Sequence, residues 1–347
     1  MGDNDVNRRL RLLSLDGGGI RGLSSLIVLS DFMKRVNRSR LGEDQIEPWQ
    51  FFDLIGGTST GGLLAMMLGR LRMSVEECLS CWADLSKKIF QPKRSKYNPL
   101  KAVSFLKADG RFDAEILEAG IKDIIRKKLS QPYILANEKI PTNLEEVLLW
   151  GQAEDSCKVF VCAVKGEDTR AVFLRSYDNQ NQSDHYSADF KIWEACRATS
   201  AATTFFDPFE RTSQGVRQMF VDGAFAYNNS VSRVFQEAID LWGDRETLLI
   251  SIGTGNKPDS PMVGSVKTLF KKIVDIVLAT EMEDREFQEN HSTLVEAGLF
   301  YRFNVPGMAQ VGIEKYEKLG EISAVTKSYL SEPDTNRRMK LCVEKSS

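Results

Sequence analysis

The chain has 347 residues, 42% of them hydrophobic and 27% charged, so it can bury a substantial core as one large domain or two ordinary ones. Its formal net charge of −2 argues against a general nucleic-acid binder, because such proteins need a basic face. The six cysteines follow no disulfide framework, which favours a reducing, cytoplasmic compartment. No apolar run reaches the roughly 18 residues of a membrane span, and no signal-peptide pattern opens the chain, so we expect any membrane contact to be peripheral.

Strand and helix patterns alternate along the chain. Short apolar runs predict strands at residues 10–15, 51–55, 158–164, 171–177, 217–221 and 247–252. Helical periodicity and capping signals predict helices at residues 23–36, 74–89, 113–129, 189–201, 231–242, 266–287 and 313–329. This alternation, with continuous apolar strands, is typical of a mainly parallel sheet with helices on both faces.

The pattern predicts a single α/β domain over residues 8–330. Residues 331–347 are expected to form a C-terminal tail or the start of a linker. Residues 91–112 are basic and marked by proline and glycine, which predicts an exposed excursion from the domain.

A G-x-S-x-G sequence, Gly57-Thr58-Ser59-Thr60-Gly61, lies between a strand-like run and a helix-like run. In that setting the serine sits on a sharp turn, where glycines avoid crowding and the helix start offers free N–H groups. The pattern is short and common, so other residues must decide whether Ser59 is a nucleophile.

A glycine run, DGGGIRG at residues 16–22, follows the first strand and permits two interpretations. Its glycines satisfy the dinucleotide fingerprint G-x-G-x-x-G, and an acid, Glu43 or Asp44, lies about 20 residues on. Those acids stand in a polar stretch and not at the end of a second strand, however. The alternative is an anion nest, in which the glycine N–H groups bind an oxyanion or a phosphate. Arg21 would then add a fixed positive charge or anchor the loop.

A serine nucleophile needs a base within hydrogen-bond reach. The chain has two histidines, His185 in a polar loop and His291 in a charged run, and solvent exposure is the simpler expectation for both. Asp222 ends an apolar strand and precedes a glycine, at the edge of the sheet where α/β sites form. A partly desolvated aspartate with a raised pKa could take the serine proton directly. The order Ser59, Asp222, His291 keeps a hydrolase triad open.

Other motifs are interpreted as structural. Cys78 and Cys81 form a C-x-x-C inside an amphipathic helix without a second pair, which argues against metal or redox chemistry. The aromatic residues Trp193, Phe205 and Phe206 are expected in the core or lining an acyl pocket. The lysines at positions 267, 271 and 272 are expected to form a solvated face.

Taken in order, the motifs DGGGIRG, GTSTG and DGA (residues 222–224) closely resemble those of the patatin-like phospholipase family. The resemblance extends to RATSAA (residues 197–202) and SIGTG (residues 251–255), and so covers roughly residues 10–330. Each motif alone is weak, whereas the ordered set is specific. The resemblance implies a three-layer α/β/α sandwich and a serine acyl hydrolase that uses a Ser–Asp dyad, with neither a metal nor a catalytic histidine.

The resemblance assigns the site residue by residue: Ser59 is the nucleophile, Asp222 the base, Gly57 and Gly61 shape the elbow, and Gly17, Gly18 and Gly19 form the oxyanion hole with Arg21 beside them. It implies a phospholipid or another acyl lipid as substrate, bound from a membrane or lipid-aggregate surface. Thr203 and Ser230 stand where the family often has proline, which leaves the pocket shape and substrate preference open. Some family members are domains of larger multidomain proteins.

These observations predict hydrolysis of fatty acyl esters through an acyl-enzyme intermediate, with no cofactor and no nucleic-acid partner. Two alternatives stay open: a nucleotide-binding protein that uses the loop at residues 17–22, and a catalytically silent lipid-binding regulatory domain.

Overall fold

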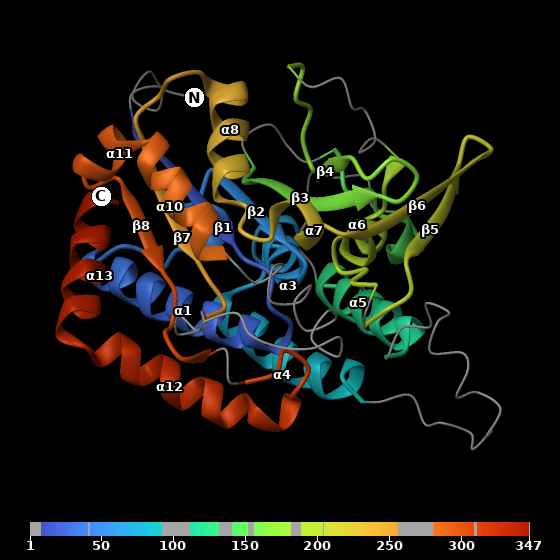
Figure 1. Ribbon diagram of the computed structural model, residues 1–347, viewed down its shortest axis with the longest axis horizontal. Helices are drawn as coiled ribbons and strands as arrows, with labels where there is room; N and C mark the ends of the chain where they lie inside the picture. Colours follow the sequence, from blue (N-terminus) through green and yellow to red (C-terminus); the bar gives the residue numbers. More distant parts are fainter. Residues whose placement is uncertain are drawn as a thin grey trace, which may run out of the picture.

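The computed structural model of the protein describes residues 8–40, 42–91, 112–131, 141–151, 156–181, 189–203, 205–255, 280–308 and 311–346. Eight strands form one sheet: β1 (Leu10–Leu15), β2 (Leu54–Thr58), β3 (Lys158–Lys165), β4 (Ala171–Arg175), β5 (Phe209–Ser213), β6 (Val216–Asp222), β7 (Thr247–Ile252) and β8 (Phe300–Phe303). Their order is β5-β6-β3-β2-β1-β7-β8, with β4 paired to β3 (Figure 1). The pairs from β3 through β2, β1 and β7 to β8 are parallel, whereas β4, β5 and β6 join by antiparallel pairs.

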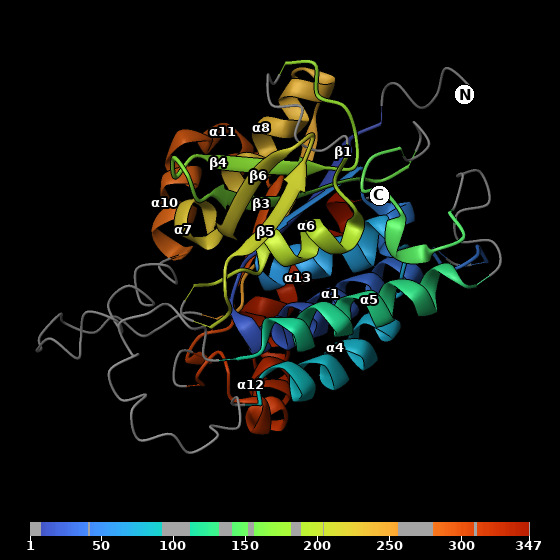
Figure 2. The same ribbon diagram turned by 90° about the vertical axis from the view of Figure 1, so that its right-hand side faces the viewer.

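Helices cover both faces of the sheet (Figure 2). One layer contains α1 (Gly22–Ser39), α2 (Pro48–Phe51), α3 (Thr60–Ala65) with the π-helical turn η2 (Met66–Arg70), α4 (Val75–Ile89), α5 (Ala114–Leu129), α6 (Ile192–Thr199), α12 (Leu319–Ser331) and α13 (Pro333–Lys345). The other contains α7 (Ala224–Tyr227), α8 (Val231–Trp242), α10 (Thr280–Asn290) and α11 (Ser292–Glu296). Short 3-10 turns are η1 (Gly19–Arg21), η4 (Leu144–Glu146) and η7 (Tyr316–Lys318). The predicted three-layer sandwich with a mainly parallel sheet is confirmed.

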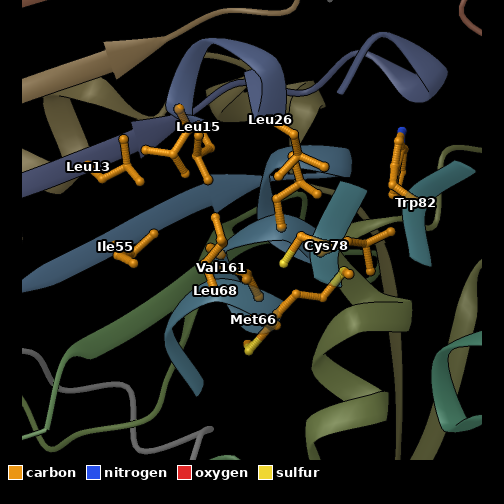
Figure 3. Close-up of a cluster of buried hydrophobic side chains, with 14 of the residues drawn as sticks. Leu13, Leu15, Leu26, Ile55, Met66, Leu68, Cys78, Trp82 and Val161 are labelled. Carbon is orange, nitrogen blue, oxygen red and sulfur yellow. The ribbon is translucent and has the colours of Figure 1, made fainter. Parts of the chain in front are cut away.

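Strand β1 shows why the central strands are largely apolar. Leu13 and Leu15 belong to the larger hydrophobic cluster, under α1, α3 and α4, while Leu10 and Leu12 belong to the smaller one under α8 and α10. Both faces are covered, so most positions along the strand are apolar. The buried Ser14 is an exception whose Oγ lies 3.0 Å from that of Ser230, and Arg11 is only partly buried. Figure 3 shows the larger cluster, in which strand residues face helix residues such as Leu26, Cys78 and Trp82.

The structure differs from the sequence expectation in several elements. Phe51 closes helix α2 and does not begin a strand, because Pro48 occupies the first helical turn and Glu47 caps it through a capping box. Strands β5 and β8 and helix α13 were not expected. Residues Pro333–Lys345, expected within a tail, form α13, in which Met339 and Cys342 are fully buried.

Some expected features lie outside the described residues. They are most of the excursion at residues 91–112, the greater part of the helix at 266–287 with its three lysines, and His185. Within the described part of the chain, none of the helices combines the length and hydropathy needed to cross a membrane.

Candidate active site

The sheet register brings the ends of β2 and β6 together. Strand β4 occupies one edge of β3, so β2 and β6 share the other edge. There Thr58, the last residue of β2, pairs with Cys162, and Asp222, the last residue of β6, pairs with the next residue, Ala163. The two strands run in opposite directions and meet end to end. Ser59 therefore follows β2 directly beside Asp222, although 163 positions separate them in the chain.

Ser59 occupies a strained turn that close backbone approaches enforce. Its φ is 54° and its ψ −123°, a conformation that costs energy for a residue with a side chain. A Cβ on Gly57 would lie 2.3 Å from the carbonyl oxygen of Gly61, and a Cβ on Gly61 would lie 2.1 Å from that of Leu15. Both glycines of the motif are thus required for the turn to form. The Ser59 N–H donates to Thr199 Oγ1 at 2.9 Å, which holds the turn from α6.

Asp222 is buried and hydrogen-bonded to Ser59. Ser59 Oγ donates to its Oδ2 at 2.6 Å, and the backbone N–H of Ala224 donates to its Oδ1 at 2.8 Å. The carboxyl is 1% exposed. Burial raises the pKa of Asp222 to about 7, against the opposing effect of those two hydrogen bonds, which favour the ionised form. A carboxylate with a pKa near neutrality is well matched to accept and return a proton.

The glycine loop lies against the elbow. A Cβ on Gly18 would lie 2.0 Å from Thr254 Oγ1, so the loop packs too closely for any side chain at that position. The Gly17 N–H donates to the Asn228 carbonyl at 3.1 Å and is already used. Among the described residues, no acceptor takes the N–H of Gly18 or Gly19. Gly18 and Gly19 line the same cavity as Ser59, so their N–H groups are available to an oxygen bound there.

Arg21 lies behind the loop and not among the residues that line the cavity. It is almost fully buried, its Nη1 lies 3.5 Å from the carbonyl oxygen of Gly255, and burial lowers the pKa of its guanidinium to about 10. Glu43, the acid of the dinucleotide interpretation, follows the end of α1. The 18-residue helix places Glu43 and the adjacent Asp44 about 27 Å from the loop, and Glu43 lies with Arg9 and Arg11 near the start of β1, at the other end of the strand. That placement does not fit a ribose contact beside the glycines.

His291 packs into the opposite helical layer. Its Nδ1 lies 2.9 Å from the Phe287 carbonyl oxygen, and its ring stacks on Phe287 with a centroid separation of 4.3 Å. It does not line the cavity that holds Ser59.

Cys78 is a buried free thiol whose pKa burial raises well above its usual value. Within the described ranges, no three His, Cys, Asp or Glu residues are grouped so as to hold a metal ion.

A mainly apolar cavity opens in front of the pair, with an empty volume of about 780 Å³ that includes its mouth. Ser59, Asp222, Gly18 and Gly19 lie at one side. The rest of the lining comes chiefly from apolar residues of α3, α4, α5, α7 and the loops after α6 and before α12: Leu63, Trp82, Ile89, Phe90, Leu117, Phe205, Phe206, Phe225 and Ile313. The expectation for Phe205 and Phe206 as pocket lining matches their positions. Trp193 takes the other expected position, packed against the core and edge-on to Phe209.

Sequence reasoning missed three contributors to the site. Thr199 supports the elbow, and its motif RATSAA was the available signal. Arg302 on β8 forms a buried ion pair with Asp16, at 2.6 Å between Nη2 and Oδ2, and so fixes the start of the glycine loop. Asn228 lines the cavity, with only its position after DGAFAY to mark it.

The combination of a strained serine, a buried carboxylate and free N–H groups, at the carboxyl edge of an α/β sheet, is of the type used by nucleophilic serine hydrolases. The model of the family described as patatin-like phospholipase matches residues 13–235, more than half of the chain. The chain therefore belongs to the patatin-like phospholipase family, as the ordered motifs predicted.

Individual relatives are distant. Calcium-independent phospholipase A2-gamma of Rattus norvegicus is 24% identical over 333 residues, which cover 94% of this chain but 39% of that protein. The probable inactive patatin-like protein 9 of Arabidopsis thaliana is 24% identical over 266 residues, 72% of this chain and 62% of that protein. Among solved structures, the match to VipD from Legionella pneumophila covers 92% of this chain and 67% of that chain, at 12% identity and a TM-score of 0.41.

Proposed function

We propose that the protein is a lipid acyl hydrolase of the phospholipase A or lysophospholipase type, acting through Ser59 and Asp222. The observation that carries this proposal is the 2.6 Å hydrogen bond from Ser59 Oγ to a buried carboxylate whose pKa is raised to about 7. Family membership supports the reaction class. The name of the inactive Arabidopsis relative indicates that membership alone does not establish activity, so the dyad is the part to test.

The positions of the groups support the following mechanism. Asp222 accepts the Ser59 proton as Oγ attacks the ester carbonyl, and the N–H groups of Gly18 and Gly19 bind the oxygen that becomes negative. As the tetrahedral intermediate collapses, Asp222 returns the proton to the departing alcohol, leaving an acyl-enzyme. Water then attacks the acyl carbon, Asp222 takes the water proton, and the free acid leaves as Ser59 is reprotonated.

The cavity supports a fatty acyl group as the portion bound beside Ser59. Its lining is chiefly aliphatic and aromatic, and each buried CH₂ of an acyl chain contributes about 0.8 kcal/mol to binding. Phe225, which is 45% exposed, stands among the lining residues and would meet the lipid surface from which substrate enters. We propose peripheral contact with membranes or lipid aggregates on this basis.

The test is covalent labelling combined with turnover. A fluorophosphonate probe should label the wild-type protein but not Ser59→Ala, and Ser59→Ala and Asp222→Ala should each lose hydrolysis of a p-nitrophenyl ester and of a lysophospholipid. Circular dichroism of each variant provides the folding control. Retained hydrolysis in Ser59→Ala would refute the proposal. An unlabelled wild-type protein without turnover would favour a silent lipid-binding domain, and tight binding of a dinucleotide would favour the nucleotide interpretation.

A further inference from the structure

The side chain of Asn228 is buried and unpaired. It is 3% exposed, and neither its Nδ2 nor its Oδ1 has a hydrogen-bond partner within the described part of the chain. Buried amide groups in folded proteins are nearly always paired, because leaving them unpaired costs the full price of removing them from water. An exception beside a reactive serine therefore calls for a functional explanation.

The carboxamide stands next to the nucleophile. A Cβ built on Gly17 would lie 2.3 Å from Asn228 Oδ1 and 3.2 Å from Ser59 Cβ, so the amide and the serine flank the same small space. Asn228 lines the cavity together with Ser59 and Asp222. The absence of a side chain at Gly17 is what leaves room for the amide.

The backbone holds Asn228 in place without using its side chain. Thr58 Oγ1 donates to the carbonyl of Tyr227, and the Gly17 N–H donates to the carbonyl of Asn228 at 3.1 Å. These bonds tie residues 227 and 228 to the ends of β2 and β1, on either side of the site. The side chain is thus positioned from both neighbouring strands while its own polar atoms stay unpaired.

The next residue shows the contrast. Asn229 is equally buried, but its Nδ2 donates to the carbonyl of Thr280 at 3.1 Å and its Oδ1 accepts from the N–H of Val231 at 3.0 Å. Its amide is satisfied inside the protein and joins α10 to the start of α8. The adjacent asparagines therefore differ: the amide of Asn229 is structural, whereas the amide of Asn228 is buried and unpaired at the wall of the cavity.

We propose that Asn228 is a further catalytic residue, whose Nδ2 donates a hydrogen bond to an oxygen of the reacting ester as negative charge develops in the transition state. This inference rests on the proposed acyl hydrolase function. The cavity lining is otherwise mainly apolar, so the ester is the part of an acyl substrate that needs a polar partner beside Ser59. A neutral amide donor supplies that bond without adding a charge next to Asp222.

The experiment compares Asn228→Ala, the similarly sized Asn228→Asp, and Asn229→Ala with the wild-type protein. Measured are kcat and KM on a p-nitrophenyl ester and on a lysophospholipid, and the midpoint of thermal unfolding. Asn228→Ala should lower kcat by about 10²–10³-fold on both substrates, the usual effect of removing an oxyanion donor, with KM changed far less. Asn228→Asp should lose activity at pH 8, because an ionised carboxylate cannot donate.

Stability separates this role from a structural one. Asn228→Ala should leave the unfolding midpoint unchanged or raise it, because it removes unpaired buried groups, whereas Asn229→Ala should lower the midpoint. Three results for Asn228→Ala would each overturn the inference. They are turnover within threefold of wild type, a loss of turnover accompanied by a lowered unfolding midpoint, and a loss of turnover confined to the lysophospholipid. In those cases inactive Ser59→Ala would still uphold the acyl hydrolase function. A wild-type protein without turnover or labelling would overturn both.

Discussion

Replacing Asp222 by asparagine should abolish hydrolysis and at the same time stabilise the fold at neutral and alkaline pH. Asp222 receives hydrogen bonds from Ser59 Oγ at 2.6 Å and from the Ala224 N–H at 2.8 Å. An asparagine can keep both contacts, with Oδ1 accepting from Ala224 and Nδ2 donating to Ser59. The substitution therefore removes a buried charge and the base, while the local geometry is preserved.

The size of the effect follows from the pKa of Asp222, which burial raises from 3.8 to about 7. Between these values the unfolded chain ionises and the folded protein stays protonated, so the folded state binds more protons and loses stability as pH rises. The loss is absent below pH 3.8 and complete above pH 7. At 1.36 kcal/mol for each pKa unit, wild type should lose about 4 kcal/mol across this window, about 2.5 kcal/mol of it between pH 5 and pH 8.

The assay is urea unfolding of wild type and Asp222→Asn at several pH values between 5 and 8. The stability of the variant relative to wild type should grow with pH over this range and level off above pH 7. Ser59→Ala, which keeps the carboxyl, serves as the matched inactive control and should not show this gain. A difference between Asp222→Asn and wild type that stays constant with pH, or that shrinks as pH rises, would refute the assignment of a raised pKa to Asp222.

Further expectations concern pH, histidine, the glycine loop and the buried ion pair. Because only ionised Asp222 accepts a proton, kcat/KM should fall about tenfold per pH unit below pH 7 and be flat above it, and a profile flat from pH 5 to 8 would contradict this. His291→Ala should keep wild-type kcat on a p-nitrophenyl ester, since its ring lies outside the cavity; a hundredfold loss with the fold intact would point to a histidine triad. Gly18→Ala should lower kcat at least about 10²-fold, because its Cβ would lie 2.0 Å from Thr254 Oγ1 and displace the loop. An unchanged kcat would show that Gly18 takes no part in the reaction. Arg302→Met should destabilise the protein by about 3–5 kcal/mol in urea unfolding, because it leaves the buried carboxylate after β1 unpaired, and a change below about 1 kcal/mol would show that the pair is dispensable.

Much of the site could be predicted because its parts are local in sequence. The elbow around Ser59 is a strand, a turn and a helix within a few residues, and Asp222 ends a recognisable strand. The residue patterns made Asp222 a candidate partner of Ser59 but left a histidine triad open, because the meeting of the two depends on β2 and β6 sharing one edge of β3. The unpaired amide of Asn228 could not be found at all, because its sequence neighbour Asn229 has the same residue type and the opposite role.

The missed elements are those that tertiary contacts decide. Strand β8 (Phe300–Phe303) follows a helix closely and has only four residues. A run of that length is too short to show a strand periodicity. Strand β5 (Phe209–Ser213) is mostly polar, because it lies at the edge of the sheet. Helix α13 buries few side chains and is otherwise polar, although Pro333 after Glu332 was an available start signal.

The residues that hold the glycine loop lie later in the chain than Ser59 and Asp222. Ser59 and Asp222 both precede residue 235, where the family match ends, but the loop is held by later residues. Thr254 Oγ1 donates to the Gly17 carbonyl at 2.7 Å, and the Ile313 carbonyl accepts from the Ile20 N–H at 2.9 Å. Two separately expressed pieces, cut at the exposed turn of Gly243, would thus each lack half of a working centre. If the proposed dyad of Ser59 and Asp222 hydrolyses esters, turnover would report the reassembly of the two pieces, because one piece carries the dyad and the other holds the glycine loop in place.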